Sequence, residues 1–137
     1  MEELRWIDRR EMNRPILVVA LKGLFDAAEA ATAGVDLLIA KHDASLVAEI
    51  DPESFFNFQE ERPIVRLGEH GREIEWPSNK IWGAQCPSGN HDLLLLSGIE
   101  PHLRWKTFSE SLTEVARLMD VEMVITIGAM ADMAPHT

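Results

Sequence analysis

Three apolar segments of the sequence end in the same way, with a glycine that is followed by acidic side chains. The segments are VVALKG, LLLLSG and VITIG, and they close at Gly23, Gly98 and Gly128. A fourth segment, LVAEI, closes at an aspartate. The polar residues that follow the four segments are Asp26, Glu29, Asp51, Glu100, Arg104, Asp132 and His136. Acids gathered with one arginine and one histidine could form the rim of a small-molecule site or a protein interface.

These residues are expected to lie at one edge of the fold. In an open α/β sheet, ligands bind in the crevice beyond the carboxyl ends of the strands. Each residue also has a structural interpretation. Asp26 could cap a helix and Glu29 could stabilise its first turn. Glu100 and Arg104, four positions apart, could pair with each other.

The familiar catalytic and cofactor motifs are missing from the sequence. Neither GxxxxGK[ST] nor GxGxxG follows the first apolar segment, and there is no GxSxG sequence. The five histidines show no HxH or HxxxH spacing, and a single cysteine makes a structural zinc site implausible. That cysteine, Cys86, has no basic neighbour in sequence to activate a thiolate. We therefore expect no catalytic residue of a known motif, no metal and no cofactor.

The elements that must position the polar residues follow from the hydrophobic pattern. Runs that are apolar at every position indicate strands covered on both faces, and a period of three to four residues indicates a helix. The expected strands are Ile16–Leu21, Leu46–Ile50, Lys80–Cys86, Leu93–Gly98 and Val121–Ile127, with a hairpin formed by Ile64–Leu67 and Arg72–Trp76. The expected helices run from about Leu24 to His42 or Asp43, and from Trp105 to Met119.

This order predicts one α/β domain over residues 1–137. It is a three-layer α/β/α sandwich with a mostly parallel central sheet and an antiparallel hairpin insert, preceded by a polar arm, residues 1–14. Residues 53–61 are expected to form a short helix or an aromatic loop. An aromatic contact surface is predicted from Phe55, Phe56, Phe58, Trp76 and Trp82.

Composition excludes several classes of protein. Thirteen basic and 23 acidic residues give a formal net charge of −10, which disfavours binding to nucleic acid or to an acidic membrane. The apolar fraction of 46% is too high for a disordered chain. One cysteine, no apolar leader and no membrane-length apolar run predict a cytoplasmic protein.

Five segments together resemble the proteasome assembly chaperone family, in its actinobacterial type. They are GLFDAAEAAT (23–32), VAEIDPESFFNFQEERPIVRL (47–67), REIEWPS (72–78), GIEPHLRWKTF (98–108) and ITIGAMADMAPHT (125–137). The sequence departs from the family pattern at Leu24, where tryptophan is usual, at Ala28, where glycine is usual, and at His102, where asparagine is usual.

The resemblance implies a fold like that of nucleoside phosphorylases and a role in assembling the proteasome α-ring without a cofactor. It also implies protein partners, proteasome α-subunits among them, and self-association. Family members are about twice as long, so the chain is expected to correspond to their amino-terminal half. The sequence has no tyrosine and therefore cannot form the tyrosine-containing tail of some members. An enzyme of the phosphorylase, hydrolase or ATP-dependent ligase type, with its site at the strand ends, stays open as the alternative.

Overall fold

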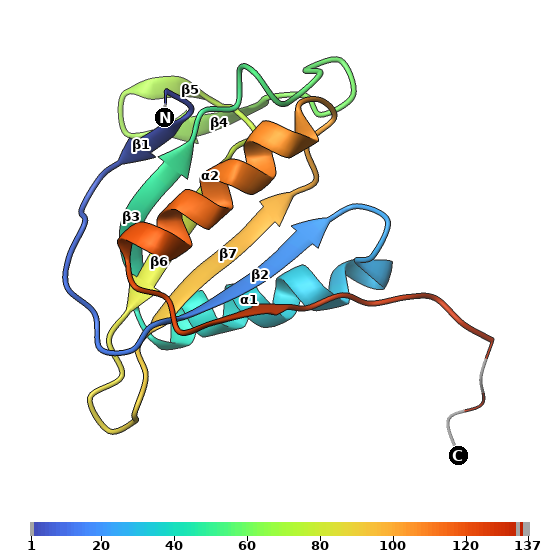
Figure 1. Cartoon of the computed structure of the whole chain (residues 1–137). Helices are drawn as coiled ribbons and strands as arrows, with labels where there is room; N and C mark the ends of the chain where they lie inside the picture. Colours follow the sequence, from blue (N-terminus) through green and yellow to red (C-terminus); the bar gives the residue numbers. More distant parts are fainter. Residues whose placement is uncertain (1, 134, 136–137) are drawn as a thin grey trace.

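A mixed sheet of six strands forms the centre of the structure, a computed structural model that describes residues 2–133 and 135 (Figure 1). The spatial order of the strands is β1-β3-β6-β7-β2-β8. The strands are β1 (Leu4–Trp6), β2 (Ile16–Lys22), β3 (Ser45–Ile50), β6 (Asn79–Ala84), β7 (Leu93–Ile99) and β8 (Met123–Thr126). Two helices, α1 (Ala30–Lys41) and α2 (Trp105–Leu118), accompany the sheet, and a 3-10 turn, η1 (Ala27–Glu29), precedes α1.

Four of the six strands run in one direction. Strand β2 pairs in parallel with β7 on one side and with β8 on the other. Strand β6 pairs antiparallel with both β7 and β3, so β3 runs in the same direction as β7 and β2. The carboxyl ends of β2, β3, β7 and β8 therefore share one edge of the sheet. Strand β1 is the outermost strand at the end of the sheet away from β8, and it pairs antiparallel with β3.

The two helices lie on opposite faces of the sheet, so the predicted three-layer α/β/α fold is confirmed. Phe108 and Val115 of α2 pack with Leu17 of β2 in the larger core. Ala31 and Val35 of α1 pack on the other face, in a smaller core that contains alternate residues of the same strand. Adjacent residues of β2 thus point to opposite layers, which explains why that segment is apolar at every position.

A separate hairpin consists of β4 (Ile64–Gly68) and β5 (Gly71–Glu75), paired antiparallel as the sequence predicts (Figure 1). Every residue of both strands is exposed to solvent. The hairpin therefore forms an arm outside the two cores.

Residues 53–61 form turns and no regular helix, as in the loop alternative of the prediction. Two local features differ from the prediction. Residues 4–6 of the predicted polar arm form β1. Helix α1 begins at Ala30, later than predicted, because Ala28 and Glu29 have left-handed backbone conformations with φ of 54° and 57°. Within the described residues, neither helix is long and apolar enough to cross a membrane.

Candidate functional site

The chain segments that follow β2 and β8 run side by side at the carboxyl edge of the sheet. The amide of Ala129 donates to the carbonyl of Phe25 at 2.6 Å, and the amide of Ala27 donates to the carbonyl of Ala129 at 3.1 Å. These two bonds extend the parallel pairing of β2 and β8 past the last strand residues. They hold the walls of a cavity at the strand ends.

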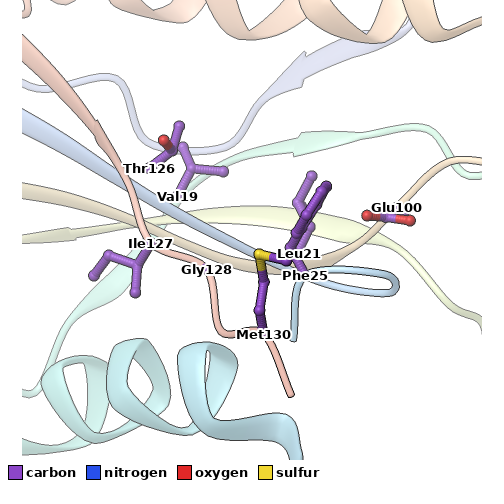
Figure 2. A pocket seen from close by; sticks show the side chains of 8 residues that line it. All are labelled: Val19, Leu21, Phe25, Glu100, Thr126, Ile127, Gly128 and Met130. Carbon is purple, nitrogen blue, oxygen red and sulfur yellow. The ribbon is translucent and has the colours of Figure 1, made fainter. Parts of the chain in front are cut away.

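The cavity has a volume of about 420 Å³ and a mainly apolar lining (Figure 2). It is lined by Val19, Leu21, Phe25, Glu100, Thr126, Ile127, Gly128 and Met130. Figure 2 shows the side chains of Met130 and Phe25 beside Leu21, with the carboxylate of Glu100 farther along the same edge. The lining offers apolar contact and one negatively charged acceptor.

Glu100 is held in place by the close approach of two strand ends. Its backbone amide donates to the carbonyl of Lys22 at 3.0 Å. Its carboxyl group lies over Gly23, where a Cβ atom would overlap it. A glycine at the end of β2 therefore leaves room for the only carboxylate among the residues that line this cavity.

Asp26 lies at the same edge, but it is buried and caps α1. Its Oδ1 atom accepts hydrogen bonds from the amides of Ala31 and Thr32 at 2.9 and 3.0 Å. Its Oδ2 atom accepts from the hydroxyl of Thr32 at 2.6 Å. The hydroxyl bond, helped by the two amides, lowers the pKa of Asp26. The carboxylate is thus committed to the helix and does not line the cavity.

Glu29 and Asp132 are exposed and occupy different surroundings. Glu29 lines a second hollow of about 240 Å³, next to Lys22 and Asp36. The carboxylate of Asp132 accepts a hydrogen bond from the amide of Met133 at 2.7 Å. His136, the last member of the predicted set, lies outside the described residues.

Asp51 and Arg104 lie toward the β1 side of the structure. The carboxylate of Asp51 accepts from the amide of Glu53 at 3.2 Å. Arg104 forms an ion pair with Glu3 at 3.0 Å, and its guanidinium lies 5.8 Å from the centre of the Phe55 ring. Arg104 has a left-handed backbone conformation just before α2, and its side chain pairs toward β1 instead of toward Glu100.

The predicted aromatic surface divides into a buried part and an accessible part. Phe55 and Phe56 are buried, and the Phe55 ring meets that of Phe108 edge to face at 5.9 Å. These two rings belong to the core beneath α2 and are not available for surface contact. Phe58 packs on Trp76 at the foot of the hairpin, with their ring centres 4.9 Å apart. Trp82 is half-buried and packs against the α1 core.

The hairpin carries an aliphatic face that lies outside the predicted aromatic contact surface. The register pairs Val65 with Ile74 and Leu67 with Arg72, so the three aliphatic side chains share one face. Arg72 lies on that face too, while Ile64, Arg66, Glu73 and Glu75 occupy the other face, where Arg66 pairs with Glu75. Alternation of apolar and charged residues was the available signal, and it fits an antiparallel strand with one apolar face.

Neither a metal site nor an activated thiol is found in the part of the chain that the structure describes. No three histidine, cysteine, aspartate or glutamate side chains there come together as a metal site. Burial, and then the nearby charge of Asp92, raises the pKa of the Cys86 thiol. A raised pKa reduces the thiolate fraction at neutral pH.

Several solved structures resemble this fold. A PAC2 family protein from Streptomyces avermitilis is 34% identical, with a TM-score of 0.85, and the match covers 89% of this chain and 52% of that one. The proteasome-assembly chaperone homologue Rv2125 from Mycobacterium tuberculosis is also 34% identical, with a TM-score of 0.82 and the same two coverages. A protein of unknown function from Corynebacterium glutamicum shares the fold at 24% identity and a TM-score of 0.86, covering 99% of this chain and 53% of that one.

The chain thus spans about half the length of these solved relatives. No curated protein matches it. The model of the PAC2 family matches residues 20–137, which include both helices, the hairpin and every residue that lines the cavity except Val19. The chain therefore belongs to the PAC2 family.

Proposed function

We propose that this chain is a non-catalytic protein-binding domain that acts in proteasome assembly, self-associates and contacts proteasome α-subunits. Membership of the PAC2 family and 34% identity to a proteasome-assembly chaperone homologue support this proposal. A single unpaired thiol fits a reducing compartment such as the cytoplasm. The hairpin supplies the surface that such a function needs.

The aliphatic face of the hairpin is the observation that carries the proposal. Leu67 is 87% exposed, and Val65 and Ile74 on the same face are each more than half exposed. A cluster of exposed aliphatic side chains on a chain with a net charge of −10 is typical of a protein interface, whose centre is depleted of charge. Trp76 directly follows β5 at the foot of the hairpin, is 49% exposed and adds an aromatic side chain of the kind enriched in interfaces.

The cavity beside Glu100 supports a second candidate function. A volume of about 420 Å³ falls in the range of ligand pockets, and its position fits the rule for ligands in α/β sheets. An enzyme of the phosphorylase, hydrolase or ATP-dependent ligase type would use this cavity. The apolar lining favours an apolar ligand or side chain over a phosphate.

Binding of purified, unassembled proteasome α-subunits to the immobilised chain tests the first function. We expect saturable binding that Ile74→Asp weakens at least about tenfold, because a charge placed in the centre of an interface loses its hydration. Glu73→Ala, on the opposite face of the same strand, is the matched control and should leave binding unchanged. Equal binding by both variants would remove the hairpin from the interface, and absence of binding would refute the α-subunit as partner.

Calorimetry with nucleosides, inorganic phosphate and ATP tests the second function. Saturable binding of one of these compounds that Glu100→Gln weakens would favour an enzyme. The proposal of a protein-binding domain predicts no heat of binding with any of them. Leu67→Ala is the control, because this hairpin residue is not among those that line the cavity.

A further inference from the structure

A hollow of about 300 Å³ lies between the foot of the hairpin and the α1 side of β6. Ile64, Glu75 and Trp76 line it from the hairpin, and Lys80 and Trp82 line it from β6. It shares no lining residue with the cavity of about 420 Å³ described above. The hollow is therefore a second place where a small ligand could bind.

The open face of β6 results from the position of α1. Helix α1 packs on β2 and β7, and β6 is the next strand beyond β7. Ile81 points toward α2 and is buried there, while its neighbours Lys80 and Trp82 point to the other face and are half-buried. The alternation of β6 thus places a cation and an indole ring side by side on a partly open surface.

Two tryptophans give the hollow a flat apolar lining. Trp76 is 49% exposed, and the ring of Phe58 packs against it with the ring centres 4.9 Å apart, which restricts its orientation. Trp82 packs at the margin of the α1 core. Aromatic rings bind well against indole rings, and a volume of about 300 Å³ is at the lower end of the range for ligand pockets. The lining therefore fits one small planar group.

The two acidic side chains at the hollow already have cationic partners. Glu61 pairs with Lys22 at 3.4 Å, and Glu75 pairs with Arg66 on the hairpin. Neither of these two cations lines the hollow. The negative charges of the lining are therefore balanced from outside it.

The two basic side chains at the hollow have no such partner. Arg62 and Lys80 both line it, and neither forms an ion pair within the described residues. The whole chain has only 13 basic residues and a net charge of −10. Two free cations beside two indole rings favour a ligand that combines an aromatic ring with a negative charge.

We propose that this hollow binds a small aromatic carboxylate, whose ring contacts Trp76 and Trp82 and whose carboxylate pairs with Lys80 and Arg62. The two glutamates of the lining remain nearby, and they disfavour a ligand with two or more negative charges. A free phosphate or a nucleoside triphosphate therefore fits this hollow less well than a single carboxylate.

The inference goes beyond the proposed protein-binding function and does not depend on it. Ile64 and Glu75 face each other across the hairpin, on the face opposite Val65 and Ile74. The small ligand and a protein partner of the aliphatic face therefore use different surfaces of the same arm.

Nuclear magnetic resonance titration of the isotope-labelled chain tests the proposal with three indoles that differ in charge. Indole-3-acetate is the anion, indole-3-acetamide the neutral analogue and tryptamine the cation. We expect indole-3-acetate to shift the amide signals of residues 75–82 saturably and to bind at least about tenfold more tightly than the amide, with tryptamine weakest. Equal affinities, a preference for tryptamine, shifts confined to other residues, or no saturable shift up to about 10 mM would overturn the proposal.

Substitutions separate this site from the proposed protein interface. Lys80→Met should weaken the binding of indole-3-acetate at least about fivefold, and Lys41→Met, at the exposed end of α1, is the matched control. Arg62→Gln, at an exposed position, is the second variant if Lys80→Met lowers the melting temperature. Ile74→Asp should leave indole-3-acetate binding unchanged, although it is expected to weaken binding of α-subunits. Unchanged affinity for indole-3-acetate in both Lys80→Met and Arg62→Gln would refute the proposal, whatever the result with α-subunits.

Discussion

The carboxylate of Asp26 accepts a hydrogen bond from the hydroxyl of Thr32 at 2.6 Å, across the irregular start of α1. The residue directly before the helix, Glu29, is left-handed and provides no side-chain cap. Asp26 caps the helix in place of Glu29. Its carboxylate accepts hydrogen bonds from the backbone amides of Ala31 and Thr32, which would otherwise have no partner in the first turn. The side chain therefore fixes the helix that covers one face of β2.

Replacing Asp26 by asparagine should destabilise the fold at neutral pH and have less effect in acid. The hydroxyl of Thr32 and the two amides lower the pKa of Asp26 below its ordinary value of 3.8, so they stabilise the charged form. That stabilisation is complete above the ordinary pKa and is lost as the pH falls through the lowered one. Circular dichroism melts of Asp26→Asn at pH 7 should show a midpoint lower by about 5 °C, with a smaller difference near pH 2.5.

Asp36→Asn is the control for this experiment, because Asp36 is exposed on the same helix. Its midpoint should follow that of the unmodified chain at both pH values. A difference for Asp26→Asn that is constant from pH 7 to pH 2.5 would contradict the electrostatic origin of the effect.

Alanine substitutions at two glycines should have opposite effects on stability. At Gly98 a Cβ atom would overlap the Oδ1 atom of Asn79, which accepts the amide of Ile99 at 2.8 Å. Gly98→Ala should therefore cost about 1–3 kcal/mol, because a buried hydrogen bond is lost or strained. At Gly34, within α1, the space is open, and Gly34→Ala should stabilise by about 0.5–1 kcal/mol through helix propensity.

Urea unfolding of both variants measures these two free energies. Both substitutions add the same methyl group. Each variant therefore serves as the control for the general effect of replacing glycine by alanine in the other. A stable Gly98→Ala protein would show that Asn79 can move away without loss.

The packing of α2 depends on Phe108. Its ring is buried and meets those of Phe55 and Trp105 edge to face, with centroid distances of 5.9 and 6.3 Å. Phe108→Ala should lower the free energy of unfolding by about 3–5 kcal/mol, since it removes a large core side chain and leaves a cavity. Trp105→Ala, at an exposed position, should cost clearly less in the same urea titration. An equal decrease in the free energy of unfolding for both variants would mean that packing on the outer face of α2 contributes as much to stability as packing on the inner face.

The helices, the hairpin and most of the strands were predictable because their signals are local. Periodicity within α2 and unbroken apolar runs in β2 and β7 identify the elements without knowledge of their neighbours. Strand β1 was missed because it has three residues, one of them charged, and pairs with β3 more than 40 positions away. Pairing over such a distance leaves no pattern in the short segment itself.

The edge of the sheet at which the cavity lies was easier to predict than the contacts of the individual side chains. Parallel strands bring Glu100 and the residues after Gly23 to one edge, and that follows from strand direction alone. The partner of Arg104 could not be predicted, because it is Glu3, which directly precedes the missed strand. The burial of Phe55 likewise depends on α2 packing above it, so aromatic composition alone could not separate core from surface.

Alkylation of Cys86 should be slow at neutral pH and should accelerate only at a pH above that of an ordinary thiol. Burial is the larger cause of its raised pKa, and the charge of Asp92 adds to it. The carboxylate of Asp92 also accepts the amide of Cys86 at 2.9 Å, which keeps this charge beside the thiol. Iodoacetamide labelling across pH 6–10 gives the profile, and the chain unfolded in guanidinium gives the rate of the free thiol as control. Faster labelling of the folded chain at pH 7 would mean an activated thiolate, and it would strengthen the enzymatic alternative over the protein-binding one.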